Sequence, residues 1–349
     1  MKINSHMSLP SAAVLEMTYR CNHQCIFCCC PWEAPDTVYP KVAELTISEW
    51  IDVVDCLCSR GVQSLVLSGG EPLVKNDLKE LILHIASKRS LDGKTRIRPY
   101  IISNGALLND KWLELFAETQ ATLALSVPGI KTYEYHTKFD RVSHVLKWIA
   151  RSSSAGIYTV ANVTATRKNL FELYENVGLS LLHGANFVLL NRFLPGGRGL
   201  SYSDELLLSK EETLRAFRTV DAALNDGKRW GGVGTEVPMC ALSNTNFKRL
   251  SISTKCAAGN ELFVIDPSGR IRVCNHSPVV LEKWTEIDKI DNNPYWRLFA
   301  EKNFLPEYCL RCSQKSVCDA GCREAAHILC GSPDSPDWIM ESHDLVPIE

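Results

Sequence analysis

Five cysteines fall within ten consecutive positions near the start of the chain, in the stretch RCNHQCIFCCCPWE at residues 20–33. Three of them are spaced C-x3-C-x2-C, namely Cys21, Cys25 and Cys28. Three thiolates on one short loop can hold three irons of a [4Fe–4S] cluster and leave the fourth iron open to a small molecule. A structural zinc site usually takes four ligands, often as two C-x2-C pairs, and fits this spacing less well. The spacing therefore favours an iron–sulfur site over zinc, a disulfide knot or thiols without chemistry.

The composition of the chain indicates the environment in which these thiols lie. The 349 residues include 15 cysteines, with 45% hydrophobic and 22% charged residues, which is typical of a globular chain of one large domain or two. The net charge of −2 offers no basic field for nucleic acid or for an anionic membrane. No apolar run approaches the roughly 18 residues of a membrane span, and the N-terminus lacks a secretion signal. We therefore expect a cytoplasmic protein whose cysteines stay reduced and favour metal.

Strand and helix patterns alternate over roughly the first 225 residues. Residues 46–60 predict a helix, because Thr46 and Glu49 can form a capping box and apolar residues recur at helical spacing. The alternation indicates six βα units around a parallel sheet, whose strands deliver polar loops at their carboxyl ends. The predicted strands lie in the segments VLEMT, SLVLSGGEP, RPYIISNG, ATLALSVPG, YTVANVTAT and NFVLLNRFLP.

The pattern changes after a last predicted helix at about 209–226. The remainder is rich in cysteine and has little periodicity. We expect an α/β domain at 12–227, a cysteine-rich domain at 228–335, and a tail at 336–349 whose Pro and Asp residues predict a position on the surface.

The cysteine loop and the predicted strand ends together resemble the radical S-adenosylmethionine (radical SAM) superfamily. SGGEP at 68–72 resembles the GGE motif that follows the second strand. Its glycines let the backbone approach a ligand, and Glu71 can accept hydrogen bonds from the ammonium group of SAM. SNG at 103–105 resembles the polar end of the third strand.

The later strands carry weaker signals of the same kind. LSVPG at 125–129 resembles the fourth strand end, where Ser126 would face the SAM ribose, although Pro128 replaces the usual acid. TAT at 164–166 and NRFLPGGRG at 191–199 resemble the fifth and sixth. The resemblance implies a (β/α)6 partial TIM barrel in which SAM contacts Phe27, Gly69, Gly70, Glu71, Ser103, Asn104, Ser126 and Thr164.

A second set of cysteines resembles the seven-cysteine SPASM domain, with the pattern C-x17-C including a Gly five positions before the second cysteine, then C-x2-C-x5-C-x3-C and a final cysteine. The resemblance implies two auxiliary [4Fe–4S] clusters, and three clusters in all. The implied outer ligands are Cys309, Cys312, Cys318 and Cys330, and the implied inner ligands are Cys256, Cys274 and Cys322. Cys240 is the candidate for the fourth inner ligand, and the alternative is an open iron.

The resemblance implies an enzyme that cleaves SAM to a 5′-deoxyadenosyl radical and oxidatively modifies a ribosomally made precursor peptide by a crosslink, epimerisation or backbone rearrangement. The alternatives are an anaerobic sulfatase-maturing, formylglycine-generating enzyme, an oxidase of a small molecule and a scaffold without catalysis. Only 20 residues precede Cys21, so we expect either a separate leader-binding protein or direct binding of the peptide by the enzyme itself. An electron donor such as flavodoxin or ferredoxin is a further implied partner.

Candidates for direct roles in the reaction follow the fourth and sixth strands. His136 and Asp140 lie in YEYHTKFD, and Arg192 ends the sixth strand. A surface or structural role is the competing interpretation for each. Cys29 and Cys30 are interpreted as core thiols, with substrate or cluster contact as the alternative.

Overall fold

Ten strands form one sheet in the computed structural model of the chain, which describes residues 9–242 and 245–340. Their order across the sheet is β10-β9-β1-β2-β3-β4-β5-β6-β7-β8. All neighbours pair in parallel except β9 and β10. The strands are β1 (Ala12–Glu16), β2 (Ser64–Ser68), β3 (Pro99–Ser103), β4 (Thr122–Ser126), β5 (Tyr158–Ala165), β6 (Phe187–Arg192), β7 (Trp230–Val233), β8 (Leu250–Ile252), β9 (Leu262–Ile265) and β10 (Ile271–Arg272).

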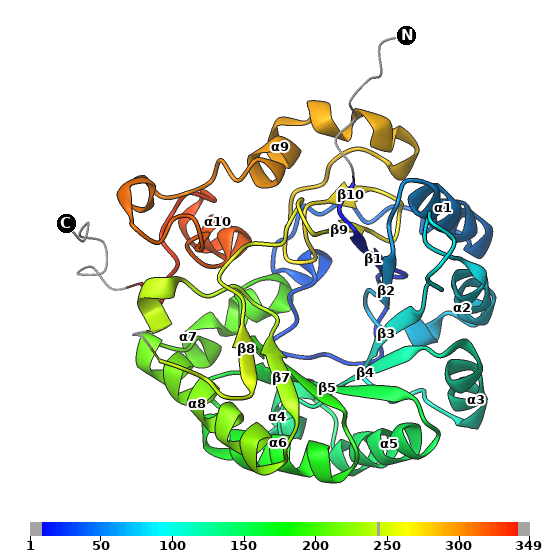
Figure 1. Ribbon diagram of the computed structural model, residues 1–349, viewed down its shortest axis with the longest axis horizontal. Coiled ribbons are helices and arrows are strands. Elements are labelled where there is room, and N and C mark those ends of the chain that lie inside the picture. The colour runs from blue at the N-terminus through cyan, green and yellow to red at the C-terminus, as the bar shows by residue number, and fades with distance from the viewer. Residues whose placement is uncertain (1–8, 243–244, 341–349) are drawn as a thin grey trace.

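Helices cover the outer face of the curved sheet, and the loop after β1, in blue, crosses its inner side (Figure 1). The α-helices are α1 (Ile47–Ser59), α2 (Leu78–Ser87), α3 (Asp110–Thr119), α4 (Tyr133–Thr137), α5 (Val142–Ser154), α6 (Leu173–Leu182), α7 (Ser203–Leu206), α8 (Lys210–Asp226), α9 (Pro294–Ala300) and α10 (Arg323–Cys330). Short 3-10 helices are η1 (Pro31–Glu33), η2 (Pro72–Val74), η3 (Leu170–Glu172), η4 (Gly197–Tyr202), η5 (Met239–Leu242), η6 (Trp284–Asn292) and η7 (Glu307–Arg311).

The six predicted βα units are confirmed, because β1 to β6 lie side by side in chain order. The predicted capping box starts α1: the Glu49 amide donates to Thr46 Oγ1 at 3.3 Å, and the Thr46 amide donates to Glu49 Oε2 at 2.8 Å. The apolar face of α1 then buries Trp50 and Val54 against the sheet. Local signals and burial therefore agree in this half of the chain.

The C-terminal part of the chain extends this sheet at both edges. β7 and β8 pair beyond β6, while β9 pairs with β1 and β10 follows it. These strands have two to four residues each, which is too short for a detectable period of two. The sheet thus continues past residue 227, and the division into domains at that point stays a prediction.

The segment expected to lie on the surface at 336–349 begins in the interior. Asp337 is 0% exposed and Ile339 is 1% exposed, and Trp338 Nε1 donates to the carbonyl of Leu208 at 3.0 Å. The expectation is wrong for these residues, because Asp337 meets a buried arginine, and 341–349 lie outside the described residues. Across the described parts of the chain, we find no helix with the length and apolar character needed to cross a membrane.

Candidate active site

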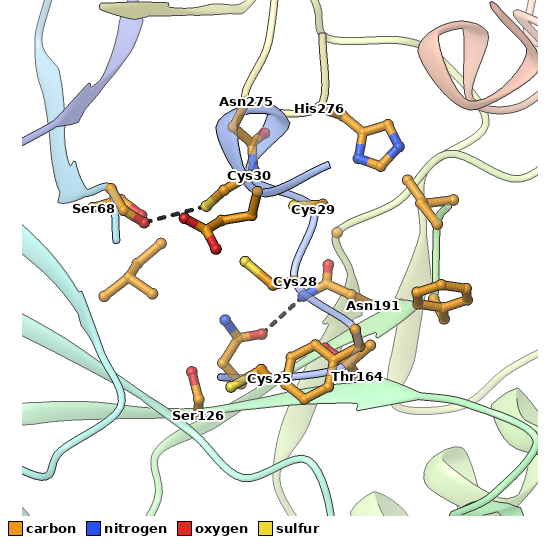
Figure 2. A pocket seen from close by; sticks show the side chains of 18 of the residues that line it. Cys25, Cys28, Cys29, Cys30, Ser68, Ser126, Thr164, Asn191, Asn275 and His276 are labelled. Atoms are coloured by element: carbon orange, nitrogen blue, oxygen red, sulfur yellow. Dashed lines mark hydrogen bonds between the residues drawn. The ribbon is translucent and has the colours of Figure 1, made fainter. Parts of the chain in front are cut away.

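A cavity of about 480 Å³ opens at the carboxyl ends of the parallel strands. The cysteine loop after β1 lines one side, and Figure 2 shows Cys25, Cys28, Cys29 and Cys30 along it. All eight residues predicted to contact SAM line this cavity, namely Phe27, Gly69, Gly70, Glu71, Ser103, Asn104, Ser126 and Thr164. The fold therefore brings together the motifs that are dispersed over the first half of the sequence.

Backbone hydrogen bonds hold the GGE turn against the cysteine loop. The amide of Gly70 donates to the carbonyl of Thr18 at 2.8 Å, and the amide of Glu71 donates to the carbonyl of Arg20 at 2.9 Å. A Cβ atom at Gly70 would lie 2.1 Å from the Arg20 carbonyl oxygen. Glycine is thus required at position 70, because the turn lies too close to the Arg20 carbonyl for any side chain. The hydrogen bonds of this turn fix the backbone just before Cys21.

The chemistry of the three thiols fits an iron–sulfur cluster. Burial raises the pKa of Cys21 to about 11 and raises that of Cys25 as well, while a hydrogen bond with Cys30 lowers the pKa of Cys28. Thiols at a half-buried cavity wall need a positive centre to ionise, and iron provides one. In 9–242 and 245–340, no group of three Cys, His, Asp or Glu side chains converges as closely as a single metal ion requires. A cluster of several irons accepts the wider spacing of this loop.

Glu71 joins the GGE and SNG motifs into one unit. Its Oε1 accepts from Ser103 Oγ at 2.8 Å and from the Leu73 amide at 3.1 Å, and its Oε2 accepts from the Asn104 amide at 2.8 Å. Burial raises the pKa of Glu71 to about 7, against the opposing effect of these hydrogen bonds. Asn104 in turn donates to Asn22 Oδ1 at 2.7 Å, so the network reaches the cysteine loop.

The ends of β5 and β6 place two asparagines on the cavity wall. Asn191 Nδ2 donates to Asn162 Oδ1 at 2.8 Å, and both line the cavity (Figure 2). Asn162 belongs to none of the sequence motifs described above, and its signal in the sequence is a polar asparagine inside an apolar strand. Pro128 also lines the cavity, and its carbonyl accepts from Asn169 Nδ2 at 2.7 Å.

The three candidates for direct roles differ in their surroundings. Arg192 lines the cavity but its guanidinium is buried in an ion pair with Asp337. His136 is fully buried, its Nε2 lies 2.9 Å from Thr166 Oγ1, and burial lowers its pKa. Neither His136 nor Asp140 is among the described residues that line the cavity, and Asp140 is exposed. These contacts favour positioning roles, and a direct role stays a prediction.

The three inner thiols, Cys256, Cys274 and Cys322, line the same cavity as the cysteine loop. Burial raises the pKa of all three, that of Cys322 to about 12. Carboxylates hold their backbone: the Cys256 amide donates to Asp319 at 2.8 Å and the Cys322 amide donates to Asp337 at 3.1 Å. These contacts hold the backbone of two of the three thiols at the cavity, and the chemistry of all three fits the auxiliary cluster that the resemblance implies.

The outer thiols lie away from the cavity. Burial and the neighbouring charges of Cys318 and Cys312 together raise the pKa of Cys309 to about 11, so these three lie together. Cys330 is exposed at the end of α10. Cys240 lies beside this outer group. The amide of the preceding residue, Met239, donates to Cys318 Sγ at 3.4 Å. The charges of Cys309 and Cys240 both raise the pKa of Tyr308, so both thiols lie near that side chain. Cys240 does not line the cavity in the described structure, so its predicted place among the inner ligands gains no support.

An open parallel partial barrel whose cysteine loop and GGE turn meet at one cavity defines a radical SAM enzyme. Residues 15–172 match the sequence model of the Radical SAM superfamily, so the predicted fold and enzyme class are confirmed. The chain is 25% identical to the PqqA peptide cyclase of Granulibacter bethesdensis, over 94% of this chain and 86% of that protein. It is 24% identical to the mycofactocin maturase MftC of Mycolicibacterium smegmatis, over 95% of this chain and 82% of that protein.

Solved structures share the fold. The crystal structure of Streptococcus suis SuiB bound to S-adenosylmethionine superposes with a TM-score of 0.74 at 17% identity, covering 95% of this chain and 77% of that chain. SuiB bound to its precursor peptide SuiA gives the same TM-score, covering 95% of this chain and 76% of that chain. This chain and SuiB therefore share one fold.

Proposed function

We propose that this enzyme oxidatively modifies a ribosomally made precursor peptide, using SAM and three [4Fe–4S] clusters. The observation that carries the proposal is that the SAM-type loops and the inner thiols line the same cavity. A substrate in this cavity lies within reach of both sites. The named sequence relatives, a PqqA peptide cyclase and a mycofactocin maturase, support a peptide as the substrate.

The cluster on Cys21, Cys25 and Cys28 supplies, when bound, the reductive cleavage of SAM to a radical that removes hydrogen from an unreactive C–H bond. The chain's own residues position and shield that chemistry. Glu71 holds the loops after β2 and β3 together, and Gly70 lets the GGE turn approach the backbone of the cysteine loop.

The part of the cavity wall formed by residues 162 and 191–194 suits an uncharged part of a peptide. Asn162 and Asn191 offer amide groups that can orient a backbone, while Phe193 and Leu194 add apolar surface. Burial of this wall excludes water, which protects a reactive substrate from side reactions. The volume of about 480 Å³ must also hold SAM, so we infer that only the modified side chains enter while the rest of the peptide stays outside.

Two partners complete the proposal. A separate leader-binding protein would present the precursor peptide, and a flavodoxin or ferredoxin would supply the electron that SAM cleavage requires. The inner and outer auxiliary clusters would return an electron from the modified substrate, which makes the net reaction an oxidation.

Iron and sulfide content of the anaerobically reconstituted protein tests the cluster count. We expect about twelve irons in the wild type and about eight after combined Cys21→Ala, Cys25→Ala and Cys28→Ala substitution, the totals for three and two [4Fe–4S] clusters. About four irons in the wild type would contradict the two auxiliary clusters.

The substrate requires a second assay. The enzyme is incubated with SAM, a reductant and the precursor peptide encoded beside its gene, and peptide mass and 5′-deoxyadenosine are measured together. Loss of two hydrogens from the peptide for each 5′-deoxyadenosine is the expected result. Equal SAM cleavage with an unmodified peptide, but formation of formylglycine in a sulfatase peptide, would instead favour the sulfatase-maturing alternative.

A further inference from the structure

A carboxylate lies beside the inner thiols. Glu236 follows β7 and lines the cavity together with all three of them. Its Oε1 accepts from the amide of Ala257, the residue after Cys256, at 3.4 Å. Its main-chain carbonyl accepts from Arg192 Nη2 at 2.8 Å. Both contacts hold the Glu236 side chain next to Cys256 and at the cavity.

The positive charge that acts on Glu236, that of Arg192, is shared with Asp337. In the described parts of the chain, no Lys, Arg or His side chain forms an ion pair with Glu236, and Arg192 is already paired with Asp337. Glu236 and the three inner thiols line the same cavity. Four acidic groups around one pocket would repel one another on ionising unless a cation lies among them.

Glu324 and Cys240 are two further candidates for the inner ligand set, and the contacts of both lie elsewhere. Glu324 also lines the cavity, but its Oε1 accepts from the Tyr295 hydroxyl at 2.8 Å and its Oε2 lies 3.2 Å from His327 Nδ1. Cys240 lies beside the outer thiols, as the Met239 contact to Cys318 places it. Of these three candidates, Glu236 is the one whose side chain contacts the residue next to Cys256 and lines the cavity with the inner thiols.

We propose that Glu236 supplies the fourth ligand of the inner auxiliary cluster, through a carboxylate oxygen. This inference rests on the proposed function, because it requires a cluster at the inner thiols. Carboxylate oxygen is an established type of metal ligand, and coordination by iron compensates the buried charge. A cluster closed in this way passes electrons but has no iron open to a substrate atom.

The test uses a background in which the SAM cluster is absent, so that its open iron does not interfere. Full-length protein with Cys21, Cys25 and Cys28 replaced by Ala is reconstituted anaerobically, reduced and examined by electron paramagnetic resonance with and without ¹³C-cyanide, a small ligand for open iron. In this background we add Glu236→Ala or Glu236→Gln, and Glu324→Gln as the matched carboxylate control.

We expect the background protein and its Glu324→Gln form to show no effect of cyanide. Both Glu236 variants should show a shifted signal with ¹³C coupling while still holding about eight irons, the content of two intact clusters. Cyanide binding to the background protein, or opening of the site by Cys240→Ala instead of by the Glu236 variants, would overturn the ligand assignment and leave the proposed function intact. Fewer than about eight irons in the background protein would overturn both, because the inner cluster itself would be missing.

Discussion

Arg192 and Asp337 form an ion pair whose two side chains are both 0% exposed, across 145 positions of sequence. Arg192 Nη1 donates to Asp337 Oδ1 at 3.0 Å, and Nη2 contacts Oδ2. Asp337 also accepts from the amide of Cys322 at 3.1 Å. The pair therefore connects the end of β6 to an inner thiol and to the C-terminal segment.

Asp337→Ala should destabilise the protein strongly, because it leaves the guanidinium of Arg192 buried without its partner. Loss of one member of a buried pair reduces the free energy of unfolding by about 3–5 kcal/mol. Urea unfolding measures this loss. Lys131→Ala, which removes the exposed pair with Glu175, is the matched control and should change the free energy by less than about 1 kcal/mol. Equal effects of the two substitutions would contradict the structural role of the buried pair.

Gly70→Ala should weaken SAM binding by tenfold or more, about 1.4 kcal/mol. The added Cβ would lie 2.1 Å from a backbone oxygen of the cysteine loop, so the GGE turn must move. Gly178→Ala is the control, since Gly178 lies within α6 and no atom lies within 4 Å of its added Cβ. That control should stabilise the helix by about 0.5–1 kcal/mol and leave SAM binding unchanged. Anaerobic equilibrium dialysis with labelled SAM gives the comparison.

Glu71→Gln should lower SAM affinity by about tenfold while keeping iron content at the wild-type value. The amide nitrogen of Gln cannot accept from the amide of Asn104 or the hydroxyl of Ser103, and loss of a charged hydrogen bond amounts to about 1.5–3 kcal/mol. Titration with SAM, followed through the cluster's spectrum, measures the affinity. A loss of iron in this variant would show that Glu71 supports the cluster loop more than the cofactor.

His136 should make the free energy of unfolding depend on pH. Burial lowers its pKa below the ordinary value of 6.5, so the folded protein holds a neutral imidazole that the unfolded chain protonates more readily. The contribution of this residue is thus present above pH 6.5 and is lost as the pH falls below that value. Urea unfolding of the metal-free chain at pH 7.5 and 5.5 should show a smaller fall for His136→Gln than for the wild type.

The same variant separates two roles of His136. A positioning role predicts a modest change in turnover that follows the loss of stability. A role as an acid or base in the reaction instead predicts that the substitution removes one limb of the pH profile of kcat, while stability at neutral pH is preserved.

Local patterns in the sequence already determined the elements and the first cluster loop. The capping box at Thr46, the six strand segments and the spacing of Cys21, Cys25 and Cys28 are signals that span a few residues each. Such signals depend on periodicity and on hydrogen bonds between close neighbours, which the chain carries wherever it folds. The seven-cysteine pattern near the C-terminus is local in the same sense.

Only the tertiary structure decided which of these groups meet. The inner thiols share a cavity with the cysteine loop because β9 pairs with β1 and β7 extends β6, and those pairings leave no periodic signal in strands of two to four residues. Glu236 reaches Cys256, and Arg192 is held by Asp337, through contacts between distant segments. The sequence around each residue does not contain its partner, because packing of the whole chain sets these distances.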